Sequence, residues 1–208
     1  MGKEKSKKRK EDIVRALMEV MSERGYERAS IAEIAKKANL RSGLIHYYFS
    51  SKLEILLMLV EFLAKELKER YQLKVESSED SAESRVYAFI DAYVEISEGS
   101  SIEAVACWVT IGAEALHLRE VRETYIRGVR KALEQLKLDL VEWLVSEGRK
   151  TDNVHLLAAG IMSAIEGAYK LAIISSDLVP AGFASPTIKQ MTKGLIEAQP
   201  FLKPQANT

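Results

Sequence analysis

Residues 30–52 read SIAEIAKKANLRSGLIHYYFSSK, and this stretch has the layout of two short helices joined by a tight turn. Ser30 and Glu33 form a capping box that opens the first helix. Asn39 can adopt the left-handed conformation that ends a helix, and a second short helix is expected from Ser42 to Tyr48. Because neither segment can bury enough surface alone, the stretch predicts a helix-turn-helix packed on a larger core.

The second short helix has two different faces. Leu40, Ile45 and Phe49 fall on the side that turns toward the core. The other side is free, and an α-helix fits the major groove of DNA, where base edges accept hydrogen bonds from Arg or Ser and a thymine methyl contacts an apolar group such as Leu44. The residues on or beside the free side are Arg41, Ser42, Gly43, Leu44, His46, Tyr47 and Tyr48.

Three residues of this stretch have two readings each. Successive helical residues lie about 100° apart, so Tyr47 and Tyr48 cannot both face inward. We expect Tyr47 to face the groove, and the alternative is that both rings cap the core of a small head. Lys52 falls in the first turn of the next helix, where free N–H groups favour a phosphate; the alternative is a solvated surface lysine.

The remainder of the chain also predicts helices. Proline occurs only at positions 180, 186, 200 and 204, and no run of strand length alternates with period two. Ser51 and Glu54 form a second capping box that opens a long helix through about Leu73. The other helices are expected at residues 7–24, 82–98, 102–117, 119–147, 153–176 and 186–198. The fold class is therefore all-α, with about nine helices.

Charge is distributed unevenly along the 208 residues. The chain has 30 Lys and Arg and 30 Asp and Glu, yet residues 1–52 hold 13 basic against seven acidic side chains, and the remainder holds 17 against 23. A basic first quarter on a larger acidic body suggests a polyanion-binding head. Binding of acidic small molecules is the milder alternative.

The N-terminal leader and the cysteine content indicate the compartment. The leader, MGKEKSKKRKED, has no apolar signal-peptide core, and the single Cys107 cannot form an internal disulfide. We therefore expect a cytoplasmic protein. The basic residues from Lys3 to Lys10 could add phosphate or minor-groove contacts, or they could form a disordered tail.

The chain resembles the TetR family of transcriptional repressors. In that family a Gly precedes a Thr-x-x-x-Ile-Ala segment, followed by a Gly-Val-Ser turn and a Leu-Tyr-x-His-Phe-x-x-Lys ending. The matching positions are Gly25, Ser30, Ile34, Ala35, Gly43, Ile45, Phe49 and Lys52, within about residues 10–57. The departures are Asn39 for the turn Gly, Arg41 for Ser, His46 for Tyr and Tyr48 for His, and they bear on which operator is read.

The resemblance implies roles for individual residues. It implies phosphate contacts from Ser30, His46, Tyr48 and Lys52, and base contacts from Arg41, Ser42, Leu44 and Tyr47. It also implies a helix-turn-helix DNA-binding domain over residues 1–50 and a ligand-binding and dimerisation domain over residues 51–208. The expected protein is a homodimeric repressor that binds a pseudo-palindromic operator on double-stranded DNA and is released by an unidentified small-molecule ligand.

Two C-terminal segments look like a dimerisation surface. Gly160, Ala164 and Ala168 recur every four residues, which leaves a face where another helix can approach closely. The final helix, with Ser185 as N-cap and Pro186 at its first position, adds Ile188, Met191 and Leu195. The resemblance implies a four-helix interface here. A membrane span is the rival reading of residues 156–174, but Glu166 and Lys170 interrupt it, so no membrane is expected.

Polar and aromatic residues on otherwise apolar helices suggest a ligand pocket. The candidates are Tyr93, Trp108, Glu114, His117, Met162, Glu166 and Tyr169. For the aromatic and Met residues plain core packing is the alternative, and for His117 a surface position. A buried carboxylate at Glu114 or Glu166 would favour a cationic ligand, because an unpaired charge inside a protein is costly.

No set of residues indicates an enzyme. His46, His117 and His155 lack metal-ligand spacing, no Gly-rich phosphate loop is present, and Cys107 has no obvious base. We therefore expect no metal and no cofactor. Two readings remain beside a regulator: an architectural DNA-binding protein without ligand control, and a helical small-molecule carrier.

Overall fold

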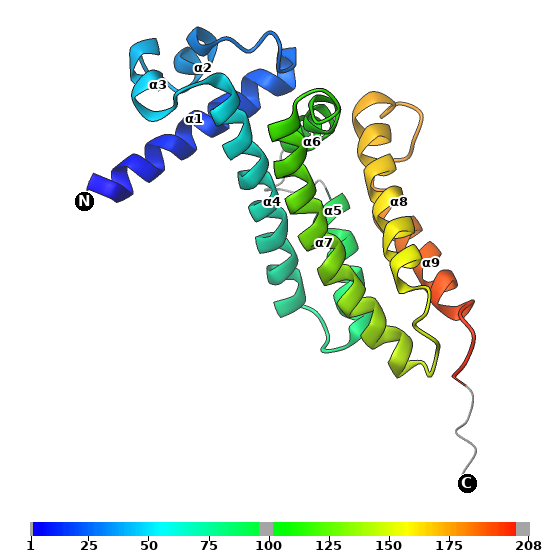
Figure 1. Ribbon diagram of the computed structural model, residues 1–208. Coiled ribbons are helices and arrows are strands. Elements are labelled where there is room, and N and C mark those ends of the chain that lie inside the picture. Colours follow the sequence, from blue (N-terminus) through cyan, green and yellow to red (C-terminus); the bar gives the residue numbers. More distant parts are fainter. Residues whose placement is uncertain (1, 96–101, 203–208) are drawn as a thin grey trace. The chain divides into compact units, whose positions relative to one another are not determined.

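The computed structural model describes residues 2–95 and 102–202 of the chain, and these residues are predominantly helical (Figure 1). The helices within these ranges are α1 (Gly2–Arg24), α2 (Ile31–Lys37), α3 (Ser42–Tyr48), α4 (Lys52–Glu76), α5 (Ala82–Val94), α6 (Ile102–Glu114), α7 (Arg119–Ser146), α8 (Val154–Ile174) and α9 (Ala184–Glu197). Across the same ranges the only bridge of β type joins Arg149 and Phe201. The all-α prediction is confirmed.

Most helix boundaries lie within three residues of the sequence pattern, and three of the differences change a prediction. The helix expected from residue 7 starts at Gly2, so the basic leader is helical and not a disordered tail. Ser185 is not an N-cap, because α9 already starts at Ala184 and the Ser185 hydroxyl donates to Asp91 Oδ1 at 2.6 Å. The helix expected over 82–98 ends at Val94, and residues 96–98 lie outside the described ranges.

The chain forms two compact units. Unit 1 comprises residues 1–66 and 98–128, and unit 2 comprises residues 67–97 and 129–208. Helices α4 and α7 each contribute residues to both units. These two units are defined by contacts between residues of the chain. The division after residue 50 instead separates an expected DNA-binding domain from an expected ligand-binding domain, and it stays a prediction.

In unit 1 the short helices α2 and α3 pack on α1 (Figure 1). The capping box is present: Ser30 Oγ accepts from the Glu33 N–H at 3.2 Å, and the Glu33 carboxylate accepts from the Ser30 N–H at 3.0 Å. These bonds to Ser30 hold the pKa of Glu33 below its usual range. Asn39 has a φ of 55°, the left-handed conformation that separates α2 from α3. The predicted turn is therefore confirmed.

One glycine of unit 1 marks a close approach between two long helices. A Cβ added at Gly128 in α7 would lie 3.3 Å from Ala64 Cβ in α4, closer than most side-chain contacts. A larger residue at position 128 would require Ala64 to shift by a few tenths of an ångström. Gly128 and Ala64 thus mark a close approach of α4 and α7 within unit 1.

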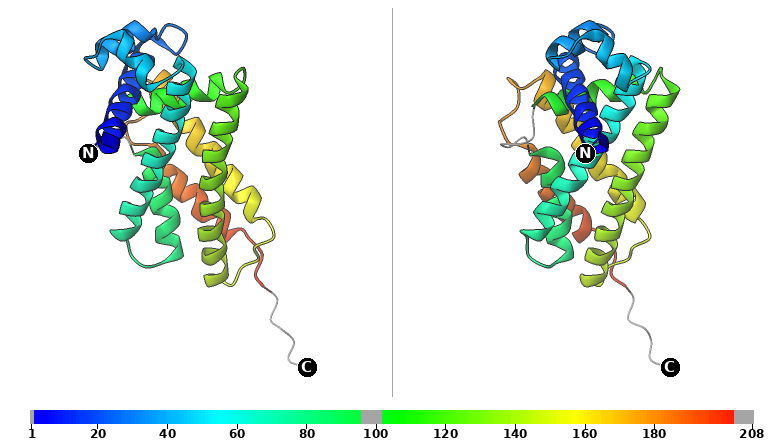
Figure 2. Two further views of the ribbon diagram at one scale, coloured as in Figure 1. Left: turned by 60° about the vertical axis from the view of Figure 1, so that its left-hand side comes forward. Right: turned by 90° about the vertical axis from the view of Figure 1, so that its left-hand side faces the viewer.

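In unit 2, α8 and α9 lie side by side and both pack against α5 (Figure 2). By length and composition α8 could cross a membrane, since its most apolar window has a mean hydropathy of 1.5. That test is weak evidence, because a core helix of a soluble protein passes it too. Leu157, Ile161 and Ile165 are buried on the side that packs within unit 2.

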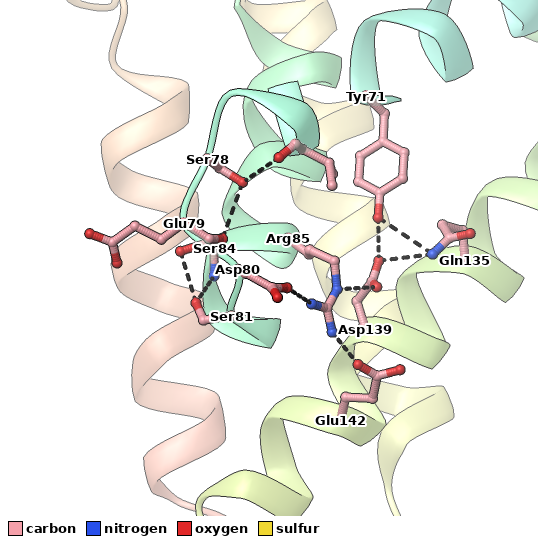
Figure 3. A network of polar contacts seen from close by, with 11 residues as sticks. Tyr71, Ser78, Glu79, Asp80, Ser81, Ser84, Arg85, Gln135, Asp139 and Glu142 are labelled. Atoms are coloured by element: carbon pink, nitrogen blue, oxygen red, sulfur yellow. Dashed lines mark hydrogen bonds and ion pairs between the residues drawn. The ribbon is translucent and has the colours of Figure 1, made fainter. Parts of the chain in front are cut away.

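A polar network ties α4, α5 and α7 together within unit 2 (Figure 3). Asp139 on α7 is buried and accepts hydrogen bonds from Tyr71 Oη at 2.8 Å, Gln135 Nε2 at 3.2 Å and Arg85 Nε at 3.3 Å. Arg85 also pairs with Glu142. Because a buried carboxylate needs partners, this network fixes how the three helices pack.

Removal of the Arg85 side chain should destabilise unit 2. Arg85→Ala leaves the Asp139 charge buried without its cation, and we expect a loss of about 3 kcal/mol, the low end for a broken buried pair because Arg85 keeps 22% exposure. Denaturant unfolding measures this loss. The matched control Arg85→Ala/Asp139→Asn also removes the charge and should be less destabilised than Arg85→Ala alone. Equal losses would contradict this role of the ion pair.

Candidate nucleic-acid interface

Helix α3 is divided into a buried and an exposed side, and we call it the recognition helix. Ile45 and the following Phe49 are buried in unit 1. On the other side, Leu44 is 39% exposed and Tyr47 is 78% exposed. An aromatic ring and an aliphatic side chain are thus held in solvent by a helix of seven residues. That surface is available to a partner molecule.

The two adjacent tyrosines are arranged differently, as the helical geometry requires. Their rings meet edge to face, with centroids 5.0 Å apart and an interplanar angle of 89°. Tyr48 is half-buried beside the core, whereas Tyr47 points outward. The alternative reading, in which both tyrosine rings cap the core, therefore fits Tyr48 at most and does not fit Tyr47. Tyr48 therefore supports the outward ring of Tyr47.

The other residues predicted for DNA binding are exposed around the recognition helix. They are Ser30, Arg41, Ser42, Gly43 and His46. A Cβ added at Gly43 would meet no atom within 4 Å, so the backbone there is open to a close approach. Ser30 also has a local role, because its hydroxyl donates to Glu33 Oε2 at 3.0 Å.

Lys52, like Ser30, is a predicted contact residue whose polar atom already binds within the chain. Its ammonium donates to the carbonyl oxygens of Tyr26 at 2.9 Å and Glu27 at 3.4 Å. The same nitrogen lies 4.2 Å from the centroid of the Tyr26 ring. Lys52 is therefore neither a freely solvated lysine nor a free phosphate ligand. It anchors the loop before α2 to the start of α4, a role that the sequence pattern does not indicate because the acceptors are backbone atoms 25 and 26 residues away.

The predicted ligand residues are shared between the two units. Unit 1 contains Trp108, Glu114 and His117, and unit 2 contains Tyr93, Met162, Glu166 and Tyr169. Trp108, Met162 and Tyr169 are buried, while Glu114 and Glu166 are only half-buried. His117 is exposed in the turn after α6, because that helix ends at Glu114. His117 is thus a surface histidine in this structure.

Within unit 2, aromatic rings and a carboxylate come together around Tyr93. The Phe89 and Tyr93 rings stack with centroids 4.4 Å apart, and Tyr71 meets Phe89 edge to face at 5.7 Å. Burial raises the pKa of Tyr93, and the nearby charge of Glu166 raises it further. An aromatic face beside a carboxylate is an environment that suits a cation.

A separate cavity of about 380 Å³ lies in unit 1. It is lined by Arg15, Met18, Glu19, Ser22, Glu23, Lys37, Glu66 and Glu103, none of which the sequence analysis selected. Most of its charges are already paired: Arg15 with Glu66 at 3.2 Å, and Lys37 with Glu19 at 3.0 Å. The cavity is therefore a polar groove crossed by ion pairs.

The predicted dimer residues divide into exposed and buried ones. Gly160, Met191 and Leu195 are exposed, and Ala164 is half-buried. Ala168 and Ile188 are buried within their own chain, so including them in the surface was wrong. A four-residue repeat identifies one helix face but not which neighbour covers it. The exposed face of α8 is instead formed by Leu156, Ala159, Gly160, Ser163, Gly167, Leu171 and Ile174.

Comparisons with known proteins agree with this arrangement. Residues 13–59 match the family described as "Bacterial regulatory proteins, tetR family". The HTH-type transcriptional regulator BetI of Stenotrophomonas maltophilia (strain R551-3) is 25% identical over 191 residues, which cover 92% of each chain.

Solved structures share the fold at lower identity. A transcriptional regulator from Saccharomonospora viridis in complex with choline has a TM-score of 0.75 at 17% identity and covers 93% of this chain and 98% of its own. FadR from Bacillus subtilis in complex with stearoyl-CoA has a TM-score of 0.76 at 20% identity, with coverages of 87% and 96%. Residues 13–59 therefore match the tetR family of bacterial regulatory proteins in sequence and in helix-turn-helix geometry, and the chain is a helix-turn-helix regulator of transcription.

Proposed function

We propose that the protein is a homodimeric repressor that binds a pseudo-palindromic DNA operator through the recognition helix and is released by a small cationic ligand. The observation that carries the proposal is the outward face of α3, where Leu44 and Tyr47 stay exposed on a helix anchored by Ile45. Exposed apolar groups at the free face of a short helix suit the major groove.

The proposed contacts follow the geometry of the head. Arg41, Ser42, Leu44 and Tyr47 contact base edges, and the open backbone at Gly43 lets α3 enter the groove. Ser30, His46 and Tyr48 contact phosphates. Lys52 contributes its remaining N–H to a phosphate while its other hydrogens hold the loop carbonyls.

Tyr47 and Lys52 should affect DNA binding in different ways. With operators enriched from a random duplex library, Tyr47→Ala should lose about 1–3 kcal/mol of discrimination at one base pair of each half-site, because it removes a base contact. Lys52→Ala should weaken binding to all sequences alike, because it removes charge and the loop anchor. Affinities measured over single-base-pair variants separate the two. Identical profiles for both proteins would refute the assignment of base and phosphate roles.

The exposed faces of α8 and α9 support the proposed dimer. Cβ atoms added at Gly160, Gly167 and Gly194 would meet nothing within 4 Å of their own chain. Glycine inside a helix costs about 1 kcal/mol relative to alanine, so three open helical glycines favour a close approach by another helix. Exposed Ile174 and Met191 on the same two helices would be buried by a partner.

Gly160→Glu should dissociate the dimer without unfolding the chain. The added side chain has open space in the monomer, but at the dimer face it would place a charge between closely packed helices. Sedimentation velocity should show monomers, and operator affinity should fall because the dimer is lost. Gly160→Ala is the control, and its helix should be more stable by about 1 kcal/mol. A Gly160→Glu protein that remains dimeric removes this face from the interface.

The cationic ligand is proposed from the cluster around Tyr93. The half-buried Tyr93 ring stacks on the buried Phe89, and the nearby charge of Glu166 raises the pKa of Tyr93. The solved neighbour in complex with choline agrees with a quaternary ammonium, whereas a stearoyl-CoA ligand would need a long apolar cavity. Binding in unit 2 can bias the head because α4 continues from one unit into the other.

Choline is the probe for this part of the proposal. Choline should bind by calorimetry and weaken operator affinity by about 5- to 150-fold, the usual range of allosteric coupling. The neutral isostere 3,3-dimethylbutanol should do neither, and Glu166→Gln should reduce the choline effect. Equal responses to choline and its neutral isostere would contradict a charge-selective site, while DNA binding would remain untouched.

The remaining expectations belong to the same proposal. We propose that the protein acts on DNA in the cytoplasm and catalyses no reaction. Burial raises the pKa of Cys107 to about 12, and its Sγ donates to the carbonyl of Met18, so the thiol is a packing group within unit 1. An architectural protein or a carrier would not need the outward recognition helix and the open α8 face together.

A further inference from the structure

The first turns of α1 extend beyond the folded part of the head. From Glu4 onward the first buried residue of α1 is Ile13, and residues 2–12 lengthen the helix by about 16 Å at 1.5 Å per residue. Figures 1 and 2 show this end projecting past α2 and α3. Within this part we call residues 5–10 the helical extension. Its basic residues are Lys5, Lys7, Lys8, Arg9 and Lys10.

This extension is unfavourable by itself. Cations at a helix N-terminus oppose the macrodipole, and Glu4 is the one acidic residue in the first turn. Arg9 pairs with Asp12 at 3.5 Å, whereas no carboxylate lies within ion-pair distance of Lys7 in the described part of the chain. A helical segment without a fully buried side chain among residues 4–12 and with a repulsive charge pattern is stabilised when an anion binds to it.

One side of the extension continues the inward side of α1. Lys7, Lys10, Val14, Leu17 and Met21 are spaced three and four residues apart, so they share one helix face. Val14, Leu17 and Met21 are buried in the head. Lys7 and Lys10 therefore occupy core-side positions beyond the edge of the core.

Lys10 connects that face to the recognition helix. Its ammonium lies 5.0 Å from the centroid of the ring of Phe49, the residue that directly follows α3. Its charge also acts on the Glu54 carboxyl, whose low pKa is due mainly to hydrogen bonds from Ser50. Lys7, one turn farther out on the same face, is exposed.

We propose that the helical extension adds a DNA phosphate contact outside the helix-turn-helix, made by Lys7. The inference rests on the proposed function, since it names a further part of the same DNA interface. The occupant is the phosphate backbone flanking each half-site, because the charge is complementary and the face is continuous with the recognition helix through Lys10 and Phe49. Lys5, about 200° from Lys7 around the helix, faces the opposite way.

The test compares Lys7→Gln with Lys5→Gln on an operator with long flanks. Both remove one charge from the same segment, and Lys and Gln have similar helix propensity. A phosphate contact accounts for about 0.9 in the slope of log affinity against log salt, so Lys7→Gln should lower the slope of a dimer by about 1.8. The ratio of wild-type to Lys7→Gln affinity should therefore be roughly 30-fold larger at 0.15 M salt than at 1 M salt. Lys5→Gln should change the slope far less.

A trimmed duplex completes the experiment. On DNA that ends at the outer edges of the half-sites, wild type and Lys7→Gln should bind alike, because the flanking phosphates are gone. Equal effects of Lys5→Gln and Lys7→Gln, or no effect of Lys7→Gln on long DNA, would overturn the inference while leaving the helix-turn-helix role intact. Failure of the wild-type protein to enrich any DNA sequence would instead refute the proposed function.

Discussion

Burial of Ile45 and Phe49 holds the recognition helix, and the rest of the DNA-binding surface depends on that anchor. A helix of seven residues is not stable alone, so its position comes from packing and not from its own propensity. The turn before it is fixed by the left-handed Asn39, and the loop before α2 is fixed by Lys52. Together these contacts leave Leu44 and Tyr47 outside, where a partner can reach them.

The local chemistry of residues 30–49 made this part of the fold predictable. Capping by Ser30 and Glu33, the turn at Asn39 and the bounds of α3 depend on neighbours within a few residues, and the structure has all three. Lys52 illustrates the limit, since its acceptors are carbonyls of a loop distant in sequence. The helical leader was also unexpected, because six like charges at a helix N-terminus argue against a helix.

In the body, the pattern identified helices better than it identified their neighbours. The repeat that ends at Ala168 correctly marks one side of α8, but packing within unit 2 buries Ala168 and leaves Gly160 and Gly167 open. Similarly, Glu166 was selected as a polar residue on an apolar helix, and the structure adds that its charge acts on Tyr93. Which face remains for a partner follows from tertiary packing, which periodicity alone does not contain.

Photo-crosslinking from position 47 tests the central claim most directly. With a benzophenone amino acid in place of Tyr47, the account predicts crosslinks to bases at two positions related by the operator's twofold symmetry, about one helical turn or 34–36 Å apart. The same group at Lys5, on the far side of the α1 extension, should give no base crosslinks. Crosslinks from position 47 that are absent, or that fall without symmetry along the duplex, would contradict the assignment of α3 as the helix that reads DNA.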